Sequence, residues 1–384
     1  MTVEPLAAAS RPVPLLATAA RRRELRVAAT AMVEWVPTER PRCDLDLLLT
    51  GAMHPLQGFL GRADYETVCR TMRLADGTLW PMPITLDVPA AVAEQLAPGD
   101  GLALRDPDRT LVAVLWVDDV WRPDLEAEAG LVLRTQSGAH PGVAYLRHRT
   151  HPFYVGGRLE GVRRPSSLIG HLSPEPLELQ AEFARRGWDR VVAFHTRNPM
   201  HRAHFELTRQ AAEQAGANLL LHPVTGMTKP GDVDPLTRLR CYQALLHRYP
   251  PGSVMMAAIP MAMRMSGPRD SLWNAIVRRT FGCTHYIVGR DHAGCADDDG
   301  RPFYDPYESQ DILFRHEAEI GITPVAFPAL TYVPAFDRYV PEAELPPGTE
   351  TRTVSGTELR ALLAGGGDIP EWITFPEVAA ALRG

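Results

Sequence analysis

Strand-like and helix-like segments alternate through the middle of the chain, and this alternation constrains its fold more than any other feature. The strand-like runs are short and apolar, whereas the segments between them carry apolar residues at helical spacing. The runs lie at residues 190–195, 217–224, 253–260 and 284–289, and the helix-like segments at 201–216, 234–250 and 269–282. This order predicts a parallel sheet covered by helices, whose ligands bind beyond the carboxyl ends of the strands.

Residues up to about 165 follow a different pattern. Residues 77–88, 100–106 and 110–123 alternate β-branched or aromatic residues with turn formers, and short helical patches such as 63–74 interrupt them. We expect a compact, mostly β barrel or sandwich here. The first 27 residues, rich in Ala, Pro and Arg, lack the apolar core of a secretory signal and are expected to form a flexible arm.

Two further segments complete the expected organisation. A helix is predicted over 171–188, because Ser173 can serve as its N-cap and Gly187 can end it. From about residue 325 the chain is rich in proline, and its last segment predicts a small helical cap, with the glycines at 365–367 in a turn. We therefore expect three domains, at residues 1–168, 169–325 and 326–384.

Composition narrows the classes of protein to consider. Hydrophobic residues make up 45% and charged residues 22% of the 384, as in soluble proteins, and no apolar run approaches the roughly 18 residues of a membrane span. The net charge of −6 argues against a general nucleic-acid-binding protein. Five scattered cysteines without a CxxC pair support neither a zinc ribbon nor a disulfide framework, so a cytoplasmic location is expected.

The richest motif follows the first strand of the alternating region, in VVAFHTRNPMHRAHFEL at 191–207. Asn198 can cap the next helix and Pro199 suits its first turn. His201 and His204 then share one face near the helix N-terminus, where free amides attract anions. An HxxH pair alone often arises by chance, and zinc binding needs a third ligand that is not evident.

Basic residues also follow the other strands. Arg197 adds a planar fork for phosphate or sulfate beside the histidine pair, so this loop predicts an anion cradle with two imidazole donors. Loop 225–234 carries Lys229, the only lysine among 40 basic residues, and loop 261–270 carries Arg264 and Arg269. Each loop could be merely solvated, but together they indicate a polyanionic nucleotide.

The last of these loops is GRDHAG at 289–294. Gly289 and Gly294 allow the backbone to approach a ligand closely. Arg290 and His292 can bind phosphate, while Asp291 can order the loop or bind a ribose hydroxyl. The alternative is a simple polar turn. No GxxxxGK[ST] motif is present, so a P-loop kinase is not supported.

In this order, the motifs resemble those of the ATP sulfurylase (sulfate adenylyltransferase) family. The matching blocks are GAMHPLQGFL, RLADGTLWPMPITLDV, TRNPMHRAH, HPVTGMTKPGD, AMRMSGPRD, CTHYIVGRDHAG and SGTELR. The resemblance implies an α/β protein with an N-terminal PUA-like β domain, a Rossmann-like nucleotidylyltransferase catalytic domain and a small C-terminal domain. It also implies conversion of ATP and sulfate to adenosine 5′-phosphosulfate and pyrophosphate by direct in-line attack of sulfate on the α-phosphorus.

The same resemblance implies roles for individual residues. His201 and His204 would stabilise the transition state and the departing pyrophosphate, and Phe327 would move when nucleotide binds. Catalytic residues would be Thr196, Arg197, Asn198, His201 and His204. ATP would contact His195, Thr196, Arg197, Asn198, Gly289, Arg290, Asp291, His292 and Leu330. Sulfate would contact His195, Arg197 and the backbone of Ala293.

The implied partners are small molecules and other enzymes, not nucleic acid or membranes. Mg²⁺ would be carried with ATP, and no metal bound by the protein itself is expected. The forward equilibrium is unfavourable, so a pyrophosphatase and an adenosine phosphosulfate kinase are expected functional partners. A homo-oligomer is also implied.

Two positions depart from the family pattern. His195 stands where the family usually has glutamine, and imidazole can be neutral or cationic where an amide is neutral. We therefore expect weaker or more pH-dependent use of sulfate, or use of a different oxyanion. Asn274 stands where the family commonly has a histidine, and this difference can be a simple packing change. The alternatives are an adenylyltransferase with another acceptor and a catalytically idle nucleotide-binding homologue.

Overall fold

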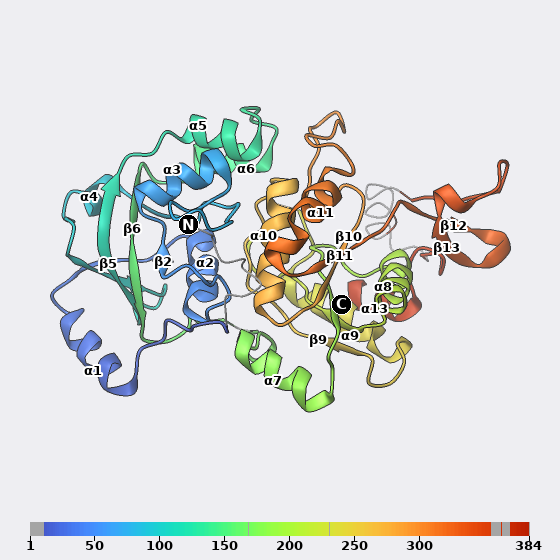
Figure 1. Cartoon of the computed structure of the whole chain (residues 1–384), viewed down its shortest axis with the longest axis horizontal. Helices are drawn as coiled ribbons and strands as arrows, with labels where there is room; N and C mark the ends of the chain where they lie inside the picture. Colours follow the sequence, from blue (N-terminus) through green and yellow to red (C-terminus); the bar gives the residue numbers. More distant parts are fainter. Residues whose placement is uncertain (1–10, 168, 230, 355–361, 363–368, 384) are drawn as a thin grey trace.

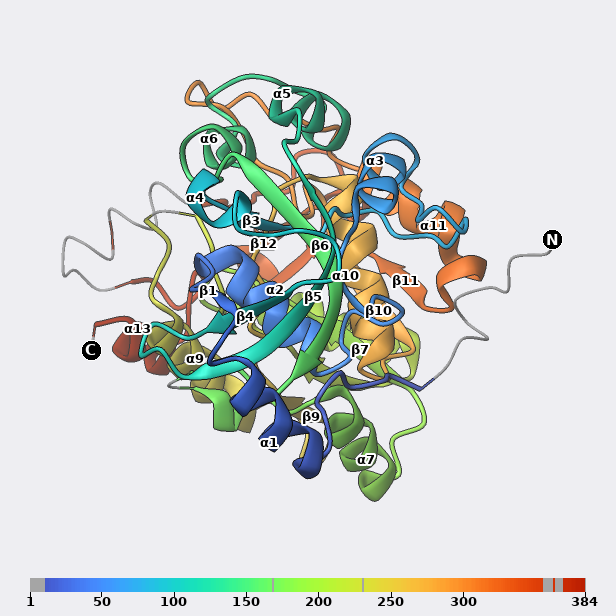
Figure 2. The ribbon, with the colours of Figure 1, turned by 90° about the vertical axis from the view of Figure 1, so that its left-hand side faces the viewer.

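The molecule is built around two β-sheets that lie side by side, each with its own helices (Figure 1). The computed structural model describes residues 11–167, 169–229, 231–354, 362 and 369–383. Figure 2 shows the N-terminal sheet face-on, in front of the second sheet.

The N-terminal sheet has six strands within the described residues, in the order β1–β4–β5–β6–β2, with β3 also paired to β6. All pairs are antiparallel except β1 with β4. The strands are β1 (Val33–Trp35), β2 (Gly58–Phe59), β3 (Leu86–Val88), β4 (Gly101–Arg105), β5 (Leu111–Trp121) and β6 (Phe153–Gly161). The helices are α1 (Ala19–Ala28), α2 (Glu39–Leu49), α3 (Arg62–Thr71), α4 (Ala90–Ala93), α5 (Leu125–Glu128) and α6 (Pro141–His148).

Several expectations for this part are corrected. β4, β5 and α3 lie where they are predicted, but only the last three residues of 77–88 form a strand, because the prolines at 81 and 83 cannot donate to a ladder. The strand order does not close among the described residues, so one sheet with helices replaces the expected barrel or sandwich. Residues 19–28 form α1 and not a flexible arm, since Thr18 caps the helix and Leu25 is buried.

The second sheet is parallel throughout, which confirms the prediction from the alternating pattern. Its order is β11–β10–β7–β8–β9. Because the chain order reverses between β7 and β10, a crevice is expected at the carboxyl ends of these two strands. The strands are β7 (Val191–Phe194), β8 (Asn218–Leu221), β9 (Val254–Met256), β10 (His285–Val288) and β11 (Thr323–Ala326). The helices that follow these strands are α8 (Arg202–Ala215), α9 (Pro235–Leu245), α10 (Pro268–Thr280) and α11 (Glu308–Ile320).

The linking helix α7 (Pro176–Arg186) begins later than predicted. Its N-cap is Glu175 and not Ser173, because Pro176 fits the first turn and Glu178 accepts a hydrogen bond from the Glu175 amide at 2.8 Å. Gly187 ends the helix as predicted, in a left-handed conformation with φ 69°.

The C-terminal part of the chain packs beside α8 and α9. A hairpin of β12 (Leu330–Val333) and β13 (Arg338–Pro341) contacts α8, and α13 (Pro376–Arg383) contacts α9. Figure 1 shows this part on the side of the second sheet that faces away from the N-terminal sheet. The predicted turn at 365–367 and the SGTELR block at 355–360 lie outside the described residues.

Candidate active site

A pocket opens where β7 and β10 end, at the crevice expected from the strand order. Its volume is about 1110 Å³, including space open to solvent. The loop after β7, the start of α8, the loops before α10 and after β10, and the start of β12 all line it. The predicted site residues among its walls are His195, Thr196, Arg197, Asn198, His204, Gly289, Arg290, Asp291, His292, Ala293 and Leu330.

The turn after β7 does not cap α8 in the expected way. The Thr196 hydroxyl accepts a hydrogen bond from the Asn198 amide at 3.1 Å, so Asn198 belongs to a tight turn. The helix begins only at Arg202, with His201 as its N-cap. The predicted Asn198 cap is therefore wrong, because Nδ1 of His204 accepts from the His201 amide at 3.2 Å instead.

This cap fixes the protonation of His204. Since Nδ1 accepts a hydrogen bond, the proton of the neutral ring lies on Nε2, and burial lowers the ring pKa to about 4. Burial, and then the neighbouring His204 ring, lowers the pKa of His201 to about 3. Both imidazoles are neutral at pH 7. His204 lines the pocket, whereas His201 is not among the pocket walls, and the two ring centroids lie 5.9 Å apart.

Some groups of the expected anion cradle already form hydrogen bonds or ion pairs within the protein. The Arg202 amide donates to the Ile373 carbonyl at 3.1 Å, so it is not available to an anion. Arg197 forms an ion pair with Asp232 of loop 225–234, whose second oxygen accepts from the Lys229 amide at 3.0 Å. Asp232 is not predicted from the sequence, because its partner Arg197 lies 35 residues away.

The loop after β10 is held in an unusual backbone conformation. Asp291 and Ala293 have positive φ values of 54° and 57°, which non-glycine residues rarely adopt. The Asp291 amide donates to Pro306 and the Ala293 carbonyl accepts from the Gly267 amide at 3.0 Å. A Cβ added to Gly289 would meet no described atom within 4 Å, so its backbone faces open space.

His195 belongs to a buried hydrogen-bonded chain beneath this loop. The Tyr286 hydroxyl lies 3.0 Å from Nδ1 of His195 and 2.8 Å from Nε2 of His292. Burial, and then the positive charge of Arg278, lowers the pKa of His195 well below its usual value and that of His292 to about 4. Burial and the charge of Arg278 thus both disfavour the cationic form of His195, which does not support the expectation of pH-dependent sulfate use.

Arg278, on α10, is a residue that sequence reasoning missed. Its side chain is fully buried, and Nη1 donates to the Asn274 carbonyl oxygen at 2.6 Å and contacts the Met261 sulfur at 3.3 Å. No carboxylate of the described residues forms an ion pair with it. Asn274 in turn donates to Asp270 at 2.8 Å, so this departure from the family pattern forms a polar link as well as packing.

The remaining predicted residues lie apart from the pocket walls. Phe327 is buried in the core, and its amide donates to Val288 at 3.0 Å. Lys229 is exposed at the surface. Arg264 and Arg269, which the sequence placed near a nucleotide, point instead to the N-terminal domain.

The described part of the chain has no group of three or more His, Cys, Asp or Glu side chains arranged to hold a metal ion. In the same residues, no helix is long and apolar enough to span a membrane. All five cysteines are free thiols.

The chain is similar to known protein families along almost its whole length. Residues 7–164 match the PUA-like domain, and residues 171–384 match ATP-sulfurylase. A sulfate adenylyltransferase of Emericella nidulans is 49% identical over 372 residues, which are 95% of this chain and 64% of that protein. A sulfate adenylyltransferase of Schizosaccharomyces pombe is 47% identical over 367 residues, which are 94% of this chain and 75% of that protein.

A solved structure extends the likeness to three dimensions. The hexameric APS kinase from Thiobacillus denitrificans matches 97% of this chain and 66% of its own chain, with a TM-score of 0.79 and 31% identity. The chain thus spans 64% of the length of the Emericella nidulans relative and 66% of this structure. Because the family match covers more than half of the residues, and the Schizosaccharomyces pombe relative is matched over 75% of its length at 47% identity, the chain belongs to the ATP-sulfurylase family.

Proposed function

We propose that this protein is a sulfate adenylyltransferase, which converts Mg²⁺-bound ATP and sulfate to adenosine 5′-phosphosulfate and pyrophosphate. The observation that carries the proposal is the convergence of Arg197, the neutral His204 and the loop at 289–294 on one pocket at the switch point of the sheet. The names of its relatives support the same reaction. Mg²⁺ enters as part of the nucleotide substrate.

The reaction is an in-line displacement at the α-phosphorus. A sulfate oxygen attacks, the bond from the α-phosphorus to the bridging oxygen breaks, and pyrophosphate leaves with the bonding electrons. Arg197 and the Ala293 amide would hold sulfate, and Nε2–H of His204 would donate to the charge that develops during transfer. His201, which is not among the pocket walls, would act through the His204 ring 5.9 Å away.

The neutral state of His204 suits this role. A neutral ring with its proton on Nε2 donates a directed hydrogen bond, and approach of a polyanion raises the pKa of the ring from about 4. Arg197 must share its guanidinium between Asp232 and sulfate. Gly289, Arg290, Asp291, His292 and Leu330 would bind ATP, and Phe327 would shift when the nucleotide enters.

A second candidate is transfer of the adenylyl group to another oxyanion. His195 supports it, since a buried imidazole in place of an amide changes the hydrogen bonds that the acceptor meets. We further propose that the protein is cytoplasmic, assembles as a homo-oligomer, and depends on a pyrophosphatase and an adenosine phosphosulfate kinase to consume its products.

A pyrophosphate-release assay with Mg²⁺-bound ATP and a panel of oxyanions tests these proposals. Release that depends on sulfate supports sulfate adenylyltransferase. Release with selenate or molybdate but not with sulfate would favour the second candidate. Binding of ATP without release for any acceptor would contradict both and indicate an idle homologue.

A further inference from the structure

Loop 261–270, whose last three residues form the first turn of α10, connects the active-site pocket to the N-terminal domain. We propose that Asp44, on α2 of the N-terminal domain, is a positioning residue for the nucleotide pocket, acting through Arg264 of this loop. The proposal rests on the proposed function only in taking the pocket to bind Mg²⁺-bound ATP. Neither residue lies among the pocket walls.

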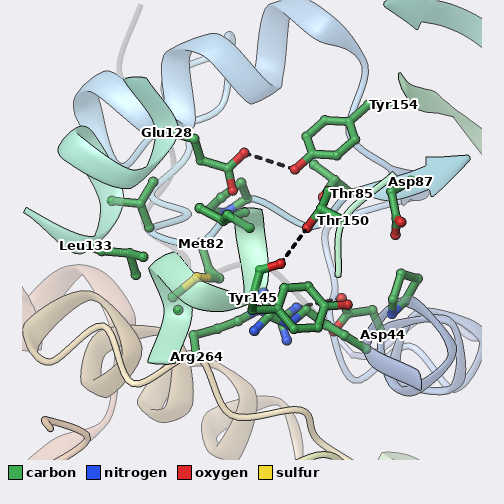
Figure 3. Close-up of a pocket in the computed structure, with 16 residues that line it drawn as sticks. Asp44, Met82, Thr85, Asp87, Glu128, Leu133, Tyr145, Thr150, Tyr154 and Arg264 are labelled. Atoms are coloured by element: carbon green, nitrogen blue, oxygen red, sulfur yellow. Dashed lines mark hydrogen bonds and ion pairs between the residues drawn. The ribbon is translucent and has the colours of Figure 1, made fainter. Parts of the chain in front are cut away.

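Asp44 and Arg264 form a buried ion pair across the two domains. The Arg264 Nη2 to Asp44 Oδ2 distance is 2.5 Å, and the two side chains are 6% and 1% exposed. Figure 3 shows Arg264 reaching Asp44 at the edge of a separate cavity of about 520 Å³, counting space open to solvent. The remaining wall residues of this cavity belong to the N-terminal domain.

This pair is poorly explained as a source of stability. Burying two charges costs desolvation energy that is recovered only if their remaining hydrogen bonds are satisfied. Oδ1 of Asp44 is buried without a hydrogen-bond partner among the described residues. Apolar side chains would fill the same space at lower cost, so the pair points to a requirement for a particular geometry.

The geometry that the pair holds is a strained loop. Oδ2 of Asp270 accepts hydrogen bonds from the amides of Arg264 at 3.2 Å and Met265 at 2.8 Å. Met265 has a φ of 59°, in the left-handed region that non-glycine residues rarely adopt. Such a conformation persists only where surrounding contacts enforce it. The ion pair with Asp44 anchors Arg264, the residue immediately before Met265.

The strained segment of the loop forms part of the nucleotide pocket. Met263 and Met265 line it, on either side of Arg264. Further along the loop, the Gly267 amide donates to the Ala293 carbonyl at 3.0 Å and so fixes the backbone proposed to bind sulfate. Releasing Arg264 would therefore disturb both the walls of the pocket and the loop after β10.

The N-terminal domain also contacts the far end of the loop. Tyr304 packs on Gly267, where an added Cβ would lie 2.5 Å from the ring. The Tyr304 hydroxyl donates to Leu133 at 3.0 Å and lies 3.0 Å from Nε2 of His140. Arg269 donates to the carbonyls of two α3 residues. Both ends of the loop are thus fixed on the N-terminal domain.

A second ion pair between the domains provides a matched control. Nη1 of Arg73 lies 2.6 Å from Oε1 of Glu319 on α11, and these side chains are 35% and 28% exposed. The pair joins the same two domains without touching loop 261–270. Losing it removes an interdomain ion pair but leaves the pocket walls in place.

The test compares D44N with E319Q by calorimetric titration of Mg²⁺-bound ATP, with KM and kcat from pyrophosphate release as a second readout. We expect D44N to weaken ATP binding by about tenfold to a hundredfold, and E319Q to change it less than about twofold. Unchanged binding in a folded D44N protein would overturn the proposal. The titration does not depend on turnover, so an enzyme inactive with sulfate would contradict the proposed function alone.

The double variant D44L/R264M separates positioning from stability. It removes both charges and is expected to restore the melting temperature if D44N lowers it, because no buried charge is left unpaired. If the pair positions the loop, ATP binding stays weak in this stable protein. Recovery of wild-type binding together with the melting temperature would show that the pair is merely structural.

Discussion

At the scale of single residues, the least expected feature is a positive charge beneath the pocket that no described carboxylate pairs with. Burial of an unpaired guanidinium is costly, so a fold retains it only where something offsets the cost. His195 and His292, whose pKa values Arg278 helps to lower, line the pocket that is proposed to bind the anionic substrates. We therefore expect the negative charge of these substrates to offset the charge of Arg278 when they bind.

The variant R278M tests this interpretation. Methionine is a shorter, unbranched apolar side chain that removes the charge, so we expect the melting temperature to hold or rise while affinity for Mg²⁺-bound ATP falls about tenfold. The pKa of His292 should rise from about 4, because Arg278 contributes to lowering it. Calorimetric titration and NMR of the histidine rings measure both effects.

R209M is the control for R278M, since Arg209 lies on the outer surface of α8 and pairs there with Glu213 at 2.6 Å. Its ATP affinity should match that of the wild type. Equal affinity of R278M and the wild type for ATP would show that the buried charge serves only the packing of α10.

A residue could be predicted to line the pocket only where it belongs to a motif that directly follows a predicted strand. Arg197, His204 and His292 follow predicted strands and lie in the pocket as expected. Asp232, Tyr286 and Arg278 had no such signal, because their partners come from distant segments that only the fold brings together. Arg264 was wrongly predicted to lie near the nucleotide for the same reason, because its partner Asp44 is distant in the sequence.

At the scale of elements, the start of α8 determines what faces the pocket. Asn198 looks like a cap in the sequence but belongs to the preceding turn. We therefore expect N198A to change the free energy of unfolding by less than about 0.5 kcal/mol, whereas loss of a true N-cap costs about 1 kcal/mol. Its activity should nevertheless fall, since Asn198 lines the pocket.

D234A provides the comparison for N198A. Oδ1 of Asp234 accepts from the Thr237 amide at 3.0 Å and caps α9. Urea unfolding of both variants should show the loss of about 1 kcal/mol for D234A alone. An equal loss in N198A would mean that Asn198 caps α8 after all.

The elements of the second sheet were largely predictable, because long apolar runs and helical periodicity are local signals. Their lateral order was not, since β7 pairs with β10 through contacts of long sequence separation. In the N-terminal domain, prolines within 77–88 keep most of an apparent strand out of the ladder. α11 and β11 are not predicted from the sequence, and they are less buried than the neighbouring α10 and β10.

At the scale of the whole molecule, buried neutral histidines couple stability to pH. Burial lowers the pKa of His140 to about 4, against the smaller opposing effect of a hydrogen bond to the Met265 backbone. The unfolded chain binds a proton below its pKa of about 6.5, and the folded protein does so only below about 4. Stability is therefore lost as the pH falls from about 6.5 to 4, and this loss reaches about 2 kcal/mol for His140 at pH 5.

H140Q removes this titration while keeping a hydrogen-bonding side chain. We expect its melting temperature to fall less between pH 7 and pH 5 than that of the wild type. H148Q is the matched control, because His148 is exposed on the same helix, and its pH dependence should follow the wild type. If the melting temperatures of H140Q and the wild type fell equally between pH 7 and pH 5, protonation of His140 would not account for the loss of stability.

The most direct measurement is sulfate-dependent pyrophosphate release by the wild type, H204A and H247A. His204 lines the pocket, whereas His247 is 67% exposed, near Glu377. We predict release by the wild type and H247A, and a loss of about a hundredfold or more in kcat for H204A with ATP binding retained. Release by H204A at the wild-type rate would contradict the placement of adenylyl transfer in this pocket.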